Sequence, residues 1–203
     1  MQRGNDAPAR DVIEDHVRRA QRGDATSFAG LYQSFYDKIF RYVLFKTGNT
    51  NDAEDITEEV FLRMLESINS FRWQGHPFSS WLFRIAHNLV VDYFRKKSRQ
   101  KTAPLEEARA IIGTSSQDMD GDLDIKLSAQ RAHQAMDGLT DLQREVLSLR
   151  FGAELSIRET AEAIGKKENA IKASQHAAVR KLRTLLVRSD EGHSDHAVPN
   201  WSR

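Results

Sequence analysis

Residues 71–99, FRWQGHPFSSWLFRIAHNLVVDYFRKKSR, restrict the possible folds of this chain more than any other segment. Pro77 suits the first turn of a helix, because the N–H that it lacks would have no partner there. From Phe78 onwards, apolar residues recur at helical spacing. This pattern predicts an amphipathic helix whose inner side carries Phe78, Trp81, Leu82, Ile85, Leu89 and Tyr93.

The same predicted helix has a polar side and a basic end. Residues three or four positions apart share a helix face, which groups Arg84, Asn88, Asp92, Arg95 and Arg99. From residue 95 to residue 101 the chain has no acidic residue, and its charged residues are Arg95, Lys96, Lys97, Arg99 and Lys101. Cations there can simply complement the helix dipole, or they can bind nucleic acid; the pattern alone leaves both open.

The loop before this helix favours nucleic acid. Trp73 and Phe71, beside Arg72 and Gln74, are residue types that stack on and hydrogen-bond an unpaired base. The pattern F-R-x-x-x-x-F-x-x-W-L-x-R-I-A-x-N-x-x-x-D-Y-x-R, from Phe71 to Arg95, resembles the promoter-melting segment of bacterial sigma factors of the extracytoplasmic-function type. The resemblance and the charge pattern together assign contact with the −10 DNA to Arg72, Trp73, Gln74, His76, Arg84, Asn88, Arg95, Lys96 and Arg99.

Length and composition set the frame. The chain has 203 residues, enough for one medium domain or two small ones, a net charge of +1 and no cysteine. The missing cysteines exclude disulfides and cysteine-ligated zinc. The N-terminus has no signal-peptide core, and no run is long enough to span a membrane, so we expect a cytoplasmic protein without membrane insertion.

The N-terminal half predicts a compact all-α domain over residues 11–101. After a disordered lead-in at 1–10, we expect helices at 11–22, from Asp24 or Thr26 to Gly48, and from Asn51 to about Ile68, followed by the 71–99 segment. The inner sides of the first and third helices are expected to carry Val12, Ile13, Val17, Ala53, Ile56, Val60, Met64 and Ile68.

The third of these helices starts with many acids. The helix dipole explains acids in a first turn, but Phe61 and Leu65 lie off the expected inner side and should be partly exposed beside them. A mixed apolar and acidic surface suits a protein partner. D-A-E-D-I-T-E-E-V-F-L-R resembles the sigma segment that docks on the clamp coiled coil of RNA polymerase. The resulting assignments to polymerase binding are Asp52, Asp55, Glu58, Glu59, Phe61 and Arg63.

Residues 102–125 predict a flexible acidic linker, and 126–188 a second helical domain. We expect helices at 127–136, at 141–151 after a capping box of Thr140 and Gln143, from Ser156 to Ile164, and at about 168–188. A short helix, a turn with Gly165 and a longer basic helix form a helix-turn-helix pattern.

This domain resembles the −35-binding domain of sigma factors. The resemblance lies in L-T-D-L-Q-R-E-V-L-S-L-R-F, S-I-R-E-T-A-E-A-I-G and A-I-K. The chain departs from the common family pattern at Lys167, Asn169-Ala170 and Ser174-Gln175. Side chains on the outer face that can reach groove edges and phosphates are Lys167, Asn169, Lys172, Ala173, His176 and Arg180.

The sequence shows no catalytic constellation, cofactor motif or metal-ligand spacing. His193 and His196 lie in a tail, 189–203, expected to be disordered, and two mobile histidines rarely hold a metal. The resemblance implies a non-enzymatic initiation factor, monomeric when alone, whose partners are core RNA polymerase, promoter DNA and an anti-sigma factor. Two rivals stay open: an autonomous helix-turn-helix regulator that binds duplex DNA unaided, and a helical protein-binding adaptor.

Overall fold

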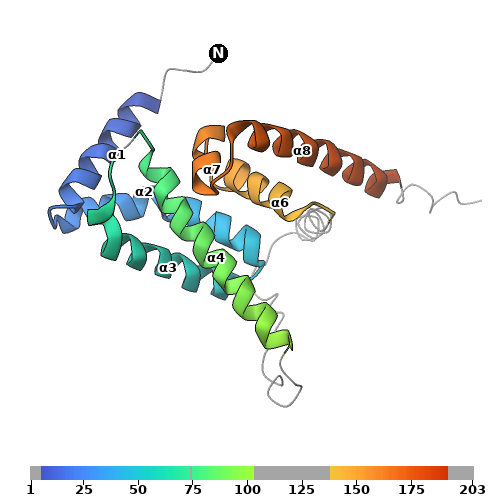
Figure 1. Ribbon diagram of the computed structural model, residues 1–203, viewed down its shortest axis with the longest axis horizontal. Helices are drawn as coiled ribbons and strands as arrows, with labels where there is room; N and C mark the ends of the chain where they lie inside the picture. Colours follow the sequence, from blue (N-terminus) through green and yellow to red (C-terminus); the bar gives the residue numbers. More distant parts are fainter. Residues whose placement is uncertain (1–5, 74, 103–137, 192–203) are drawn as a thin grey trace, which may run out of the picture. The chain divides into compact units, whose positions relative to one another are not determined.

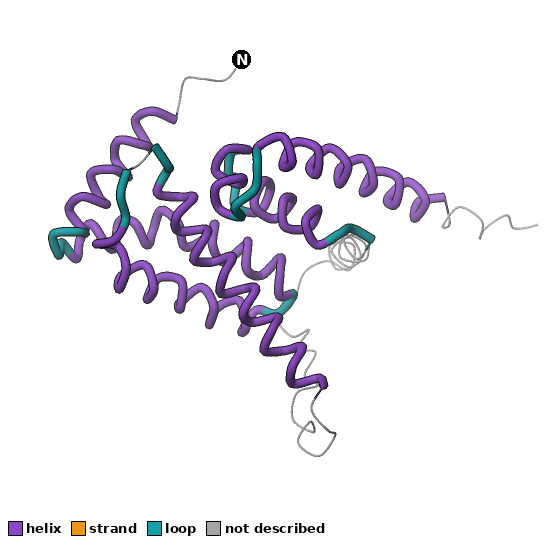
Figure 2. Tube along the Cα trace, viewed as in Figure 1, coloured by secondary structure: helices purple, strands orange, loops and turns teal. Residues whose placement is uncertain are grey.

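The computed structural model describes residues 6–73, 75–102 and 138–191, and every regular element in these ranges is helical (Figures 1 and 2). The predicted all-α class is thus confirmed. Packing divides the chain into one unit of Met1–Ser115 with Ser148–Glu168, and another of Ser116–Leu147 with Asn169–Arg203. Residues 148–168, which the sequence assigned to the second domain, therefore pack with the N-terminal helices. The domain boundaries themselves stay a prediction.

The first unit begins with α1 (Asp6–Ala20) and α2 (Ala25–Thr47). The N-cap of α2 is Asp24, whose carboxylate accepts a hydrogen bond of 3.0 Å from the amide of Thr26. Gly48 ends this helix at φ 67°, a left-handed conformation that glycine adopts without strain. The helix α1 begins earlier than expected, within the predicted disordered lead-in. Val12, expected to face inward, is 54% exposed.

The next elements are α3 (Thr50–Ser67) and the short η1 (Ile68–Ser70). The amide of Asp52 donates to the side chain of Asn49, so the N-cap is Asn49, two residues before the expected start at Asn51. The buried side of α3 is also wider than predicted. It includes Thr57 and Phe61, and the ring of Phe61 packs against Tyr32 and Tyr36 of α2.

Helix α4 (Phe78–Thr102) packs on both α3 and α2 (Figure 1). Its inner side is shifted from the predicted one, because the helix packs not only on α3 and α2 but also on residues 157–163. Phe83, Ala86 and Val90 are buried, whereas Trp81, Ile85 and Leu89 are only half-buried. The fully buried side chains at the centre of this core include Leu31, Ile39, Tyr42, Val60, Met64, Phe78, Leu82 and Phe83.

Residues 138–191 form α6 (Asp141–Leu147), η2 (Ser148–Gly152), α7 (Ile157–Ala163) and α8 (Glu168–Glu191). Both predicted capping boxes are present: Thr140 exchanges hydrogen bonds with Gln143, and Ser156 with Glu159. Leu142, expected to face inward, is 37% exposed. The turn between α7 and α8 contains Gly165 at φ 65°.

Part of the prediction lies outside the described residues. This holds for Gln74, for the linker after Thr102, for the helix expected at 127–136, and for the tail beyond Glu191 with His193 and His196.

Candidate nucleic-acid and polymerase interface

The loop between η1 and α4 is fixed to the core by its first residue. Phe71 is buried and meets the ring of Phe78 edge-on at 5.3 Å. The side-chain amide of Gln21 donates to the carbonyls of Ile68 and Phe71, at 2.9 and 3.0 Å, and holds the backbone in place. Phe71, named with Trp73 as a residue type that can stack on a base, thus has its ring in the core.

The next aromatic residue, Trp73, is half-buried and packs edge-on against Phe71, with ring centroids 4.9 Å apart. Its indole Nε1 is buried without a hydrogen-bond partner. Arg72 beside it is exposed, and its guanidinium donates to the carbonyl of Asn69 at 2.6 Å. Trp73 therefore has a structural role in addition to the stacking role predicted for it.

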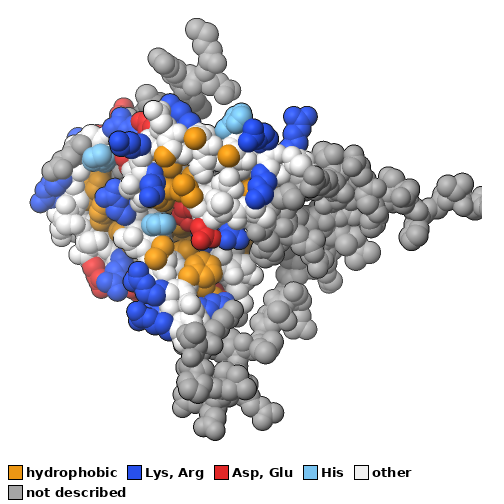
Figure 3. All heavy atoms as spheres, turned by 45° about the vertical axis from the view of Figure 1, so that its right-hand side comes forward, with side chains coloured by type: hydrophobic (Ala, Val, Ile, Leu, Met, Phe, Trp, Pro, Cys, Tyr) orange, Lys and Arg blue, Asp and Glu red, His pale blue; other side chains and the backbone are white. Residues whose placement is uncertain are grey.

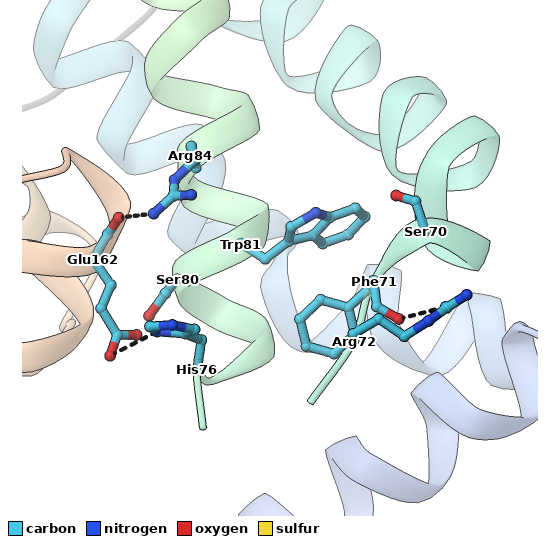
Figure 4. Close-up of a pocket in the computed structure, with 8 residues that line it drawn as sticks. All are labelled: Ser70, Phe71, Arg72, His76, Ser80, Trp81, Arg84 and Glu162. Carbon is cyan, nitrogen blue, oxygen red and sulfur yellow. Dashed lines mark hydrogen bonds and ion pairs between the residues drawn. The ribbon is translucent and has the colours of Figure 1, made fainter. Parts of the chain in front are cut away.

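A pocket opens between this loop and the first turns of α4 (Figure 4). Trp81, which the sequence analysis placed on the inner side, lines this pocket and packs on Phe71 and Phe78 with both ring centroids 5.4 Å away. The sequence could have suggested that Trp81 is partly exposed, because an indole combines an apolar ring system with a polar N–H. The lining residues are Ser70, Phe71, Arg72, His76, Ser80, Trp81, Arg84 and Glu162.

The predicted polar side of α4 faces solvent along its length. Arg84 and Asn88 are exposed near the pocket, and Arg95, Lys96 and Arg99 are exposed toward the C-terminal end. Figure 3 shows Lys and Arg side chains gathered low in the view, at the height where α4 ends in Figure 1. The helix thus carries a row of exposed polar side chains, mostly cationic but including Asp92, that starts at an aromatic pocket.

Glu162 of α7, in the same unit, reaches into this pocket. Its Oε1 lies 3.1 Å from Nδ1 of His76 and 2.9 Å from Nε of Arg158, and its backbone carbonyl accepts a hydrogen bond from Arg84 (Figure 4). Burial raises the pKa of this carboxyl, but hydrogen bonds from Arg158 and His76 outweigh it and lower the pKa below 4.5. Glu162 therefore stays charged at neutral pH.

The acidic side of α3 is a second surface. Asp55 and Glu58 are exposed, while Glu59 is half-exposed and pairs with Arg63 at 2.7 Å. Phe61 is 4% exposed and packs against Tyr32 and Tyr36, so the prediction that it is an exposed contact residue is wrong.

Two leucines supply the apolar part of this surface. Leu65 is 55% exposed as expected, and Leu62 is exposed to the same degree although the sequence analysis did not single it out. The sequence could have indicated the exposure of Leu62, because Leu62 directly follows Phe61 and therefore lies about 100° further around the helix. Asp52 is half-buried and accepts a hydrogen bond from Tyr93 of α4.

Helix α8 presents a third surface. Ile171 and Ala178 are buried, and Leu182 packs beside Ala178. All side chains predicted to contact −35 DNA are exposed: Lys167 just before α8, then Asn169, Lys172, Ala173, His176 and Arg180 along one side of it.

Within the described ranges, no group of three or more His, Cys, Asp or Glu residues could hold a metal ion. Nor does any helix there have the length and apolar character needed to cross a membrane.

Comparison with known proteins gives independent information on the family of this chain. The family models sigma-70 region 2 and sigma-70 region 4 match residues 31–100 and 135–184. The ECF RNA polymerase sigma factor SigW of Bacillus subtilis is 30% identical, over 86% of this chain and 97% of its own length. The ECF RNA polymerase sigma factor BldN of Streptomyces coelicolor is 39% identical over 84% of this chain, and the match spans 64% of BldN.

A solved structure has the same fold. The sigma factor RpoE from Bartonella quintana, in a co-crystal structure with the anti-sigma factor NepR, covers 80% of this chain and 98% of its own at a TM-score of 0.61. Its sequence identity to this chain is 22%. By its two sigma-70 regions and its match to nearly the whole of SigW, the chain belongs to the ECF RNA polymerase sigma factors.

Proposed function

We propose that this sigma factor binds core RNA polymerase through α3, reads a −35 element with α8 and opens the −10 element with α4 and the loop before it. The chain contributes binding and no covalent chemistry. The observation that carries the −10 assignment is the row from Arg84 to Arg99, which begins at the pocket lined by Trp81 and His76.

The physical basis of opening is base capture. Thermal breathing of the duplex exposes a base, and an aromatic pocket with polar groups holds it out of the stack. Arg84, Arg95 and Arg99 can then hold the phosphates of the separated strand. Phe71 supports the pocket from the core, and Arg72 and His76 contribute polar groups to its lining.

Docking on the polymerase combines charge with apolar area. Asp55 and Glu58 provide negative charge, and Leu62 and Leu65 provide exposed apolar surface beside it. Such a combination favours a protein partner over DNA, since DNA would repel the carboxylates. An anti-sigma factor as a further partner, a monomeric free state and a cytoplasmic location are part of this proposal. The complex of RpoE with NepR supports the first of these.

The test is reconstituted initiation. Core polymerase with this chain should start transcripts at a discrete site, where potassium permanganate detects unpaired thymines in the −10 region. The same DNA should give no start with core polymerase alone. A protein that binds duplex DNA tightly but never redirects core polymerase would instead be the autonomous helix-turn-helix regulator.

A further inference from the structure

We propose that Gln21 is a positioning residue of the −10 DNA surface, and that it holds the loop before α4 in the shape that presents the pocket to an unpaired base. Gln21 directly follows the last residue of α1, and neither α1 nor the turn after it has a role in the proposed function. The inference deepens that function and rests on it, because the loop is the −10 contact proposed there.

The side-chain amide of Gln21 binds the backbone of a segment that lies 47 and 50 positions later in the chain. Its Nε2 lies 2.9 Å from the carbonyl oxygen of Ile68 and 3.0 Å from that of Phe71. An amide nitrogen carries two N–H groups, so both donors of Gln21 have an acceptor. Ile68 is the first residue of η1 and Phe71 directly follows its last residue. Gln21 therefore holds both ends of the short turn that leads into the loop.

The backbone of Gln21 is itself fixed from the side of the helices. Its amide donates to the carbonyl of Val17 at 3.0 Å, which extends the hydrogen bonds of α1 by one residue, and the side chain of Val17 is fully buried. An ion pair of 2.7 Å between Arg19 and Asp24 joins the end of α1 to the N-cap of α2. Gly23, at φ 88°, allows the tight turn between them. The side chain of Gln21 thus reaches the loop from a firm support.

The backbone that Gln21 holds carries the ring beneath the pocket. The buried ring of Phe71 contacts the rings of Trp73 and Trp81, with centroids 4.9 and 5.4 Å away. The guanidinium of Arg72 donates to the carbonyl of Phe71 at 3.0 Å, the same carbonyl that Gln21 binds. A shift of the Phe71 backbone would therefore displace the aromatic and the polar groups of the pocket together. A binding site needs such groups to be held in place by supporting hydrogen bonds.

The contact requires a neutral group with two donors. Two carbonyl oxygens are two acceptors, and an amide satisfies both without placing a charge in this half-buried position. A glutamate at position 21 would offer acceptors only and would repel both carbonyls. A methionine has nearly the same length and shape but no donor, so it would leave each carbonyl without one hydrogen bond. Gln21→Met therefore removes the proposed role with little change in volume.

The experiment compares Gln21→Met with two controls. Gln33→Met makes the same substitution at an exposed position of α2 and controls for the change of side chain. Ile39→Val is a small truncation of a fully buried side chain of α2 and controls for a general loss of stability. Thermal unfolding of each variant gives the stability against which the two readouts are compared.

The first readout is the tryptophan emission of the free chain. Trp201→Phe, present in the reference chain and in every variant, leaves Trp73 and Trp81 as the remaining tryptophans, and both pack on Phe71. Gln21→Met should shift the emission to longer wavelength and increase its quenching by acrylamide, because the rings are no longer held on Phe71. Neither control should change the emission of the folded chain.

The second readout is the binding of DNA by the chain in complex with core RNA polymerase. The probes are single strands that span the −10 region found by the initiation assay, each lacking one base. The reference complex should bind about fivefold or more weakly when the captured base is missing, the low end of the contribution of one base–aromatic contact. With Gln21→Met the intact strand should bind nearly as weakly as the strand without that base. Both controls should keep the full difference, and affinity for core polymerase should be unchanged.

The contrary results are distinct. Unchanged emission in Gln21→Met would show that its two hydrogen bonds do not hold the loop, and an unchanged base preference would show that they do not serve DNA binding; either overturns the proposal. An equal loss of base preference in Ile39→Val would assign the effect to stability and overturn it as well. If the reference complex prefers no base at all, the proposed function of the loop fails, whereas the emission of the free chain still decides whether Gln21 fixes the loop.

Discussion

The hydroxyl of Tyr93 donates a hydrogen bond of 2.7 Å to the carboxylate of Asp52 and so joins the C-terminal half of α4 to the first turn of α3. Lys97 donates to the same hydroxyl at 2.6 Å. Burial, and then the bond to Asp52, raise the pKa of Tyr93. Asp52, predicted to be a polymerase contact, thus holds α4 against α3.

Tyr93→Phe should lower the free energy of unfolding by about 1–2 kcal/mol, because it removes a hydrogen bond to a charged group at a partly buried site. Urea denaturation followed by circular dichroism measures this. Asp55→Asn, which neutralises an exposed acid on the same helix as Asp52, is the control and should change stability little. Equal effects of the two variants would show that the Tyr93–Asp52 bond does not stabilise the fold.

Leu62→Ser and Leu65→Ser should weaken binding to core polymerase. Each removes apolar area at a proposed interface, and truncation of an interface anchor costs more than about 1 kcal/mol, which is roughly a fivefold loss of affinity. Val12→Ser is a matched control, because Val12 on α1 is exposed to nearly the same extent. Charge reversal with Asp55→Lys and Glu58→Lys should also weaken binding to core polymerase. The loss of affinity that these two substitutions cause should be smaller at high salt, because salt screens the charges.

If polymerase affinity, measured by co-purification and by fluorescence titration, is unchanged in both leucine variants while the fold is intact, α3 is not the docking surface.

Arg84→Ala with Asn88→Ala should impair opening of the −10 DNA but leave polymerase binding intact. Both side chains are exposed on the polar side of α4 that is proposed to face DNA, and neither belongs to the core. Permanganate footprinting should show weaker reactivity in the −10 region. Arg18→Ala, an exposed arginine on α1, is the control. Opening that is unchanged in the double variant would contradict the assignment of this row to DNA.

The contribution of Glu162 to stability should disappear in acid. Its pKa is lowered in the folded chain, so its charged form is favoured by folding and its contribution is fully present above 4.5, the ordinary value. The melting temperature of the wild-type chain should exceed that of Glu162→Gln at neutral pH. This difference should shrink as the pH falls through and below 4.5. A difference that stays constant or grows in acid would contradict the ion pairs of Glu162 with Arg158 and His76.

Local signals predicted much of this fold. The capping boxes at Thr140 and Ser156 and the helix end at Gly48 follow from residues within one turn of each other. The sequence also predicted correctly which side of α8 is exposed. A helix that packs on one side only has apolar residues at regular helical spacing on that side. Phe61 was expected to be partly exposed, and Phe83 was not named as a core residue, yet both are buried. Their burial depends on packing against a second helix, which the apolar spacing within one helix does not reveal.

The same reason explains what was missed at the pocket. Trp81 lines it because Phe71 and Phe78 fill the core beneath, and Glu162 reaches it from a segment 78 positions after Arg84. No pattern within one helix predicts such a contact. The sequence predicted which residue types would contact DNA, and the structure shows which neighbouring residues hold or cover them.

The last prediction concerns the −35 surface on α8. Lys172→Ala and Arg180→Ala each remove one exposed positive charge, so binding should weaken on every DNA sequence and its salt dependence should become shallower. Asn169→Ala and His176→Ala instead remove groups suited to reading base edges, and should change the preference among −35 variants by about 1–3 kcal/mol at a contacted base pair. Salt titrations of binding to promoter and scrambled duplexes separate the two classes. If all four variants lose affinity equally on both duplexes, α8 is a non-specific clamp, and sequence preference must lie in α4 and its preceding loop.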